Sequence, residues 1–455
     1  FRIPAQRLAL KNYQDLKGSL SLTWQTNRYS LDLAATAHPF PQVHLPPLKA
    51  EVHARGDTNA AFIETARLRA PWLSAQLSEH AQIQFRPPYL NQPVALSMEA
   101  DLGRQPWFKA QGHLTGRVRL QPTGANYPAA TFTLAGSQVG LPELQAESLQ
   151  LEGSFAWPWL KLTKTQIVLA GNSTASALAQ INLAEKFVQE ALLRFEGSWG
   201  SQLLPGKISY DHAKVSMSAT GPFTNLTHTG NIRVEHLQIL RLNPLGVNAS
   251  WQGAQMNLGG FQVAAVAGDS RLEAAGTAEL ASSRKTFQLT ELNLQTNGLP
   301  VLHLAHSTKG WLQPGQVQAN HPTNHWRIHL EGFDWEGLGR SLRLAGELVW
   351  PFEGEITSAI RNFDSSLFSD FVRRPLPPLI INQLDLSARW DRSPVKFELG
   401  MELKIPVTNA PPVSTTAQLQ GTRDGVTVKQ LVIAGPREPA ATAHGFLPVS
   451  IQPAL

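Results

Sequence analysis

Three histidines at intervals of four residues, His321, His325 and His329, are the side chains best spaced to bind a metal. On a helix this interval places the imidazoles on one face, where they can ligate zinc together. Pro322 and the alternation of apolar and polar residues from 326 to 330 instead predict a strand. The solvated face of that strand carries His325 and His329, so we predict no metal and no other cofactor.

Two carboxylates, Asp334 and Glu336, lie on either side of Trp335 and share one face of the predicted strand. Paired carboxylates on a strand surface are usually solvated, so a general acid–base pair is the less favoured interpretation. The chain lacks cysteine and contains no Gly-x-Ser-x-Gly, Gly-x-x-x-x-Gly-Lys or Gly-x-Gly-x-x-Gly motif. We therefore predict that the protein is not an enzyme.

The elements that must position these side chains are strands, because apolar and polar residues alternate along most of the chain. From Val395 to Ile405 six apolar side chains fall on one face and charged side chains on the other. The sequences of strands that are covered on both faces are unbroken apolar runs. The alternation therefore predicts an antiparallel sheet with one apolar face. At about 12 residues per strand and turn the chain holds about 38 strands.

Helical signals are few. The segment from Asp364 to Arg374 has an N-cap residue, apolar residues four apart and basic residues in its last turn, and Pro375 would end it. We predict a short helix there. The segment from Ala184 to Phe195 fits either a helix or a strand.

Composition excludes several classes of protein. The chain has 455 residues, of which 42% are hydrophobic and 16% charged, and a net charge of +5. That charge is too weak for a nucleic-acid-binding surface, so we expect no nucleic-acid partner. No apolar run is long enough to span a membrane as a helix. The chain begins at Phe1 without a signal peptide, and we interpret it as a segment of a longer protein.

A loose internal repeat places glycine within several predicted strands. The pattern apolar-x-Ala/Thr-x-Gly-x-Leu recurs around Gly112, Gly276, Gly346 and Gly445. Glycine within a strand usually marks a bend or a bulge. Repeated at corresponding places, it would curl the sheet into a trough with an apolar groove. The alternative is that degenerate strand sequences resemble one another by composition alone.

Three predicted strands supply the candidate lining of this groove. The candidates share the apolar parity of their strands, and they are Trp326, Ile328, Leu330, Leu384, Leu386, Trp390, Phe397, Leu399, Met401 and Leu403. Twelve tryptophans occur in the chain, and several share this parity. Their rings could pack a closed core or line an open groove, and the sequence by itself favours a core.

Three segments carry a resemblance to a known family. The stretch from Gly221 to Ile239 resembles the repeated glycine–proline and strand unit of TamB-like and AsmA-like proteins. The stretch from Phe371 to Trp390 is similar to that family's short helix–proline connection, and His444 to Ile451 resembles its recurrent ending. The resemblance is diffuse and clearest after Leu203. The family's N-terminal membrane helix and its C-terminal barrel-contacting domain are not visible in this chain.

The resemblance implies an elongated β-protein of the Gram-negative periplasm, anchored to the inner membrane by a segment absent here. It implies an apolar trough that binds phospholipid acyl chains and conducts lipids between the inner and outer membranes. A BamA-family outer-membrane barrel is the implied protein partner, through parts outside this chain. The family has no invariant catalytic residues to carry over.

Other interpretations stay open. The first alternative is a scaffold for outer-membrane protein assembly, whose strand edges would template incoming strands. An extracellular solenoid, a string of β-sandwiches and a carbohydrate-active enzyme with tryptophan platforms are further alternatives. No firm domain boundary is visible, and possible sub-blocks are residues 1–200, 201–360 and 361–455.

Overall fold

The structure is a computed structural model that describes residues 2–4, 13–42, 47–105, 109–123, 128–141, 144–200, 204, 208–314, 326–350, 352–374, 376–391, 394–407, 410–435 and 439–452. Within these ranges the chain forms antiparallel strands, and three short 3-10 turns are the only helical elements. The predicted all-β antiparallel fold is therefore confirmed. The described strands number 30, fewer than predicted, because many of them are 10 to 13 residues long.

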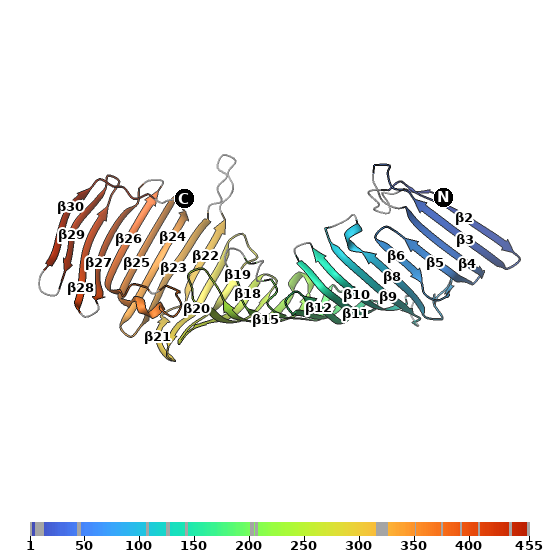
Figure 1. Ribbon diagram of the computed structural model, residues 1–455, viewed down its shortest axis with the longest axis horizontal. Coiled ribbons are helices and arrows are strands. Elements are labelled where there is room, and N and C mark those ends of the chain that lie inside the picture. The colour runs from blue at the N-terminus through green and yellow to red at the C-terminus, as the bar shows by residue number, and fades with distance from the viewer. Residues whose placement is uncertain are drawn as a thin grey trace. The chain divides into compact units, whose positions relative to one another are not determined.

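The strands group into two units, each of which is a curled sheet (Figure 1). Unit 1 comprises Phe1–Trp199 and Lys214–Leu226, and unit 2 comprises Gly200–Ala213 and Thr227–Leu455. Each unit is described by itself below.

The elements of unit 1 are β1 (Arg2–Ile3), β2 (Leu16–Gln25), β3 (Arg28–Ala37), β4 (Leu48–Asp57), β5 (Ala60–Arg69), β6 (Leu73–Leu77), β7 (Ala81–Gln84), β8 (Val94–Asp101), η2 (Leu102–Arg104), β9 (Gln111–Gln121), β10 (Ala129–Leu141), β11 (Leu144–Ala156), β12 (Trp159–Leu169), β13 (Ser173–Asn182), β14 (Phe187–Gly197), most of β15 (His212–Pro222) and η4 (Phe223–Asn225). The ladders from β1 to β5 and from β8 to β14 join sequence neighbours. Between them, the short strands β6 and β7 both pair with β5, and β6 also pairs with β8.

The elements of unit 2 are β16 (Thr227–Leu237), β17 (Leu245–Ala254), β18 (Asn257–Ala267), β19 (Ser270–Glu279), β20 (Lys285–Thr296), β21 (Leu299–Leu304), β22 (Thr308–Pro314), β23 (Trp326–Gly337), β24 (Arg340–Trp350), β25 (Glu353–Asp364), η5 (Ser365–Phe368), β26 (Ile380–Asp391), β27 (Lys396–Val407), β28 (Ala410–Gly421), β29 (Val426–Ala434) and β30 (Pro439–Leu447). Sequence neighbours pair throughout, except that β21 and β22 together fill the position between β20 and β23.

Period-two alternation and strand register together keep the apolar side chains of unit 2 on one face. Residues that are directly paired across a ladder lie on the same face of a sheet. The alternation in β23 breaks after Leu330, and a register shift between Leu330 and Phe333 absorbs the break. Leu330, Phe333 and Trp335 therefore stay on one face, as register shifts at bulges allow.

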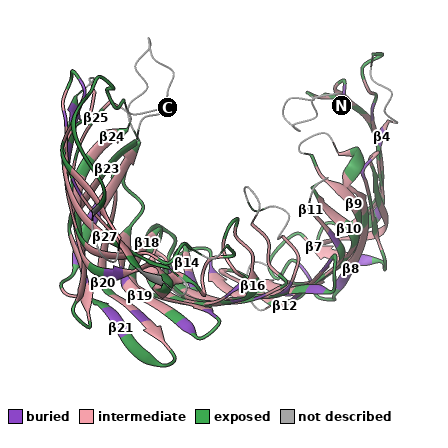
Figure 2. Cartoon of the chain, turned by 60° about the vertical axis from the view of Figure 1, so that its left-hand side comes forward, coloured by how far each residue is buried: buried purple, intermediate pink, exposed green. Residues whose placement is uncertain are grey.

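The sheets do not close over an ordinary core. The accessible surface is 28119 Å² for a chain of 49.8 kDa. A compact protein of this mass exposes about 17,000 Å², and two separate compact proteins of half this mass about 20,000 Å². Figure 2 shows that intermediate exposure predominates along the strands of both units. Much of the apolar surface is thus only half-buried.

Neither of the two segments with helical signals forms an α-helix. Asp364 does cap a helical turn, because its side chain accepts a hydrogen bond from the backbone N–H of Ser366. The turn is only the 3-10 segment η5, so the predicted helix over residues 364–374 is wrong in extent. Residues 187–195 lie in the strand β14, which excludes the helical interpretation of Ala184 to Phe195.

Candidate functional site

The ten predicted groove residues all lie on one face of the sheet of unit 2. One register row runs through Ile328, Leu348, Gly354 and Trp390 across four neighbouring strands. In the next ladder Leu386 pairs directly with Leu399. Alternation places the other candidates of β23, β26 and β27 on the same face as these residues. The structure thus places the candidates on one face, although β24 and β25 separate those of β23 from those of β26 and β27.

The same face contains apolar residues that were not among the candidates. They extend it over the strands between and beyond the predicted ones, and they include Phe287, Phe333, Trp335, Leu342, Leu344, Leu348, Trp350, Ile356, Ile360 and Leu419. Trp350 pairs directly with Trp326. The period-two alternation from Leu342 to Trp350 is the signal that could have found the residues of β24.

Aromatic rings cover glycines of the neighbouring strand on this apolar face. Trp390 lies over Gly354, where a Cβ atom would come 2.4 Å from the ring, and Phe397 lies over Gly421 at 2.1 Å. The same arrangement recurs at Trp251 over Gly230, Phe287 over Gly310 and, in unit 1, Phe132 over Gly153. Glycine leaves room for a flat ring against the neighbouring backbone. These glycines are not the ones predicted from the repeat: at Gly112, Gly276 and Gly346 a Cβ atom would first meet backbone oxygen, and at Gly445 it would meet nothing within 4 Å.

Exposure of the apolar face in unit 2 changes along the strands. At one end Leu294 is 0%, Leu302 1% and Trp335 7% exposed. At the other end Trp326 is 44%, Ile328 38% and Trp350 45% exposed. The predicted groove residue Trp390, in the register row of Ile328, is an exception: it packs edge to face on Trp350 and is 6% exposed. We call the cluster of Leu294, Leu302, Trp335 and Phe363 the covered strip, and the strand ends at Trp326 and Trp350 the open rim.

The segment that covers the strip is residues 365–374, the first part of the connection between β25 and β26, which we call the strap. Its Leu367, Phe368 and Phe371 pack against the covered strip. The ring of Phe368 lies 6.1 Å from that of Trp335 and 5.9 Å from that of Phe363, between ring centroids. Figure 1 shows the strap in orange near the ends of β21 and β23.

Hydrogen bonds fasten the strap to distant parts of unit 2. The buried hydroxyl of Ser270 donates to the carboxylate of Asp370 at 2.8 Å. The side-chain amide of Asn243 donates to the backbone oxygen of Asp370 at 2.7 Å, across 127 residues of sequence. The backbone N–H of Arg373 donates to the oxygen of Arg241 at 2.9 Å. The strap is therefore bonded to the sheet at several points along its length.

Unit 1 also has one buried and one exposed end on its apolar face. At one end Tyr13 and Trp72 are buried and pack edge to face, with ring centroids 6.1 Å apart. At the other end Trp24 stacks on Tyr29 at 5.7 Å, and Phe85 stacks on Tyr29 at 6.5 Å. Trp24 and Phe85 are more than half exposed. Aromatic residues thus lie at an exposed strand end in this unit as well.

The opposite face of unit 2 carries the charged candidates. Asp334 is paired with Arg343, with 3.0 Å between Oδ2 and Nε, and His329 lies 3.4 Å from Glu347 and stacks on Trp311. Among the described residues no group of three or more His, Asp or Glu side chains is placed to hold a metal ion. His321 and His325 lie outside the described residues.

An ion pair on this polar face lies behind the candidate leucines of β26. The guanidinium of Arg361 donates to Asp385 at 2.6 Å, and Gln383 donates to the same carboxylate at 2.6 Å. Burial acts to raise the pKa of Asp385, but these hydrogen bonds and the positive charge of Arg361 hold it below its usual range. The arrangement keeps a carboxylate charged on the solvated side of the sheet.

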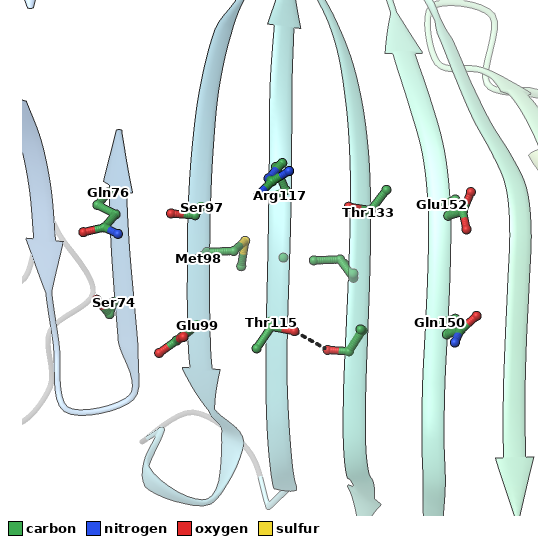
Figure 3. Close-up of a pocket in the computed structure, with 13 residues that line it drawn as sticks. Ser74, Gln76, Ser97, Met98, Glu99, Thr115, Arg117, Thr133, Gln150 and Glu152 are labelled. Atoms are coloured by element: carbon green, nitrogen blue, oxygen red, sulfur yellow. Dashed lines mark hydrogen bonds between the residues drawn. The ribbon is translucent and has the colours of Figure 1, made fainter. Parts of the chain in front are cut away.

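A hollow of about 600 Å³ lies on the polar face of unit 1. Figure 3 shows polar side chains of neighbouring strands around it, among them Gln76, Ser97, Arg117, Thr133 and Glu152. These five residues form one register row. A mixed row of hydroxyl, amide and opposite charges is typical of a solvated sheet face. The hollow therefore offers no apolar binding surface comparable with the face behind it.

Comparisons of the chain with models of known protein families, with curated proteins and with solved structures gave no match. The family resemblance inferred from the sequence therefore stays a prediction. Within the described residues no helix is both long and apolar enough to span a membrane.

Proposed function

We propose that the chain binds phospholipid acyl chains on its apolar face and conducts lipids across successive strands. In this proposal it is a periplasmic bridge between the inner and outer membranes of a Gram-negative bacterium. A BamA-family barrel would be engaged through other parts of the protein. The apolar face itself carries no catalytic role in this function.

The observation that carries the proposal is the half-exposed apolar face of unit 2. It continues from strand to strand, and most of its large side chains beyond the strap remain partly open to solvent, with Trp390 as a buried exception. Soluble proteins rarely expose a contiguous apolar surface of this extent unless something binds there. An acyl chain is a fitting occupant, because each methylene removed from water contributes about 0.8 kcal/mol.

Similarity between neighbouring strands supports movement as well as binding. One register row runs through Leu344, Ser358, Leu386 and Leu399, so leucine recurs at the same level on both sides of β25. A lipid shifted sideways by one strand therefore meets a surface of similar energy. Such a surface binds lipid without trapping it at one position.

Site-specific photocrosslinking tests the proposal. A photoreactive amino acid at Leu386 should give lipid adducts in cells and in the purified protein. The matched control is Ser387, the next residue, which is exposed on the polar face and should give none. Mass spectrometry of the adducts identifies the lipid class.

Two outcomes contradict the proposal. Equal lipid labelling at both positions would mean that lipid adheres to the protein without selecting the apolar face. Adducts with unfolded outer-membrane proteins at Leu386, in place of lipid, would support the scaffold alternative.

A further inference from the structure

The uncovered part of the apolar face in unit 2 has a limited depth. On β23 it begins at the open rim and continues to Leu330, and Phe333 next to it packs against the covered strip. From Trp326 to Leu330 is about 14 Å, and from Trp350 to Leu344 about 20 Å, at about 3.4 Å per residue. The hydrocarbon of one bilayer leaflet is about 15 Å deep, half of about 30 Å. The uncovered depth thus matches one acyl chain.

The two ends of this uncovered part differ in chemistry. At the strap end the surface is apolar, and the indole N–H of Trp335 already donates to the backbone oxygen of Leu292 at 3.0 Å. At the open rim, the ion pair of Arg327 and Glu353 lies on the polar face, at the same strand ends as Trp326 and Trp350. Tryptophan prefers the boundary between hydrocarbon and water, where its ring is in contact with apolar groups and its N–H with polar ones.

We propose that unit 2 binds phospholipid in one orientation, with the acyl chains along the strands, the chain ends against the strap and the glycerol and head group at the open rim. The inference rests on the proposed lipid binding and specifies its geometry. The strap supports this choice, because Leu367, Phe368 and Phe371 already form an apolar interface with the same face. An acyl chain beside them extends that interface towards the open rim.

The orientation is tested with two photoreactive phosphatidylcholines, added to the purified protein in mixed vesicles. One carries a diazirine at the end of an acyl chain, and the other carries it in the head group. The chain-end probe should label residues next to the strap, such as Leu330 and Leu344. The head-group probe should label the open rim around Trp326 and Trp350. Peptide mass spectrometry locates both sets of adducts.

The failures of the two proposals are distinguishable in this experiment. Labelling of both ends by both probes, or with the two ends exchanged, would overturn the orientation and leave lipid binding intact. Absence of adducts from both probes, in a protein that also carries no lipid when purified, would overturn the orientation together with the proposed function.

The strap supplies a second test, because it should limit the length of the bound chain. Phe368→Ala and Phe371→Ala should each shift the lipids retained by the purified protein towards longer acyl chains. The matched control is Leu376→Ala, in the same connection but 40% exposed, which should leave the chain-length distribution unchanged. Circular dichroism confirms that each variant is folded. Unchanged retention in both folded strap variants would overturn the role of the strap as the end of the site.

Discussion

Trp326 and Trp335 lie on the same strand and the same face, yet the first is 44% exposed and the second 7%. The first is paired with Pro314 and Trp350, and the second with Leu304 and Leu342. The difference arises from the strap, which lies over the covered strip and not over the open rim. One loop connection therefore adds cover to one part of the apolar face and leaves Trp326 accessible.

The largest effect should come from a charge in the covered strip. Leu294→Arg places a guanidinium where the native side chain is 0% exposed. We expect the free energy of unfolding to fall by about 3–5 kcal/mol, because a buried unpaired charge is poorly solvated. Urea denaturation followed by circular dichroism measures the loss. Asn293→Arg, on the opposite face of the same strand, is the control, and an equal loss in both variants would contradict the distinction between faces.

Removing a ring from the strap should have the next largest effect. Phe368→Ala deletes the contacts with Trp335 and Phe363, and Phe368 is only half-buried. We expect a loss of about 2–3 kcal/mol, less than the range of about 3–5 kcal/mol for truncations of buried aromatic residues. Trp335 should then become accessible to aqueous quenchers of fluorescence. A variant of native stability would show that the strap contributes little to the covered strip.

A charge on the open part of the face should reduce stability less than a charge in the covered strip, and it should strongly reduce lipid binding. Leu399→Arg lies beyond the strap, where the long side chain can extend its guanidinium to solvent. We expect a loss of about 1–2 kcal/mol, together with a clear loss of lipid crosslinking at Leu386. Glu398→Arg on the opposite face is the control for charge alone. A collapse in stability, without any lipid adduct in the parent protein, would mean that Leu399 belongs to a closed core.

The smallest effect on stability is expected at the open rim. Trp326→Ala removes a ring that is nearly half exposed, so we expect a loss of about 1 kcal/mol or less. Lipid retention in the purified protein should nevertheless fall, because the ring lies at the proposed position of the head group. Trp335→Ala, in the covered strip, should cause the larger loss of stability and the smaller loss of lipid retention. Equal losses of stability in the two variants would contradict the distinction between the open rim and the covered strip.

Much of the sheet could be predicted from the sequence, because period-two alternation is a local property. It placed Leu384, Leu386 and Trp390 on one face before their neighbours were known, and the register of β26 with β27 agrees. Alternation does not indicate which strands are adjacent or in which register they pair, and only the structure supplies this information. The row through Ile328 and Trp390 depends on which strands are adjacent and on the register shift in β23.

The strap could not be predicted, because its conformation depends on distant contacts. The capping role of Asp364 was recognisable from the sequence, and the structure contains it. Only one 3-10 turn follows Asp364 in place of the expected helix. The chain then continues as a strap that is hydrogen-bonded to Asn243 and Ser270. Propensity is a weak signal in so short a segment, and tertiary contacts outweigh it.

The rings seated on glycines have a consequence for how such a sheet changes in length. Each pair, such as Trp390 over Gly354, is completed by two adjacent strands and requires no partner from a distant layer. Inserting or deleting a hairpin elsewhere would leave the pair intact. Each added hairpin widens a sheet by about 10 Å, twice the strand spacing of about 4.8 Å. A sheet of this architecture can therefore gain or lose width one hairpin at a time without loss of its existing ring–glycine pairs.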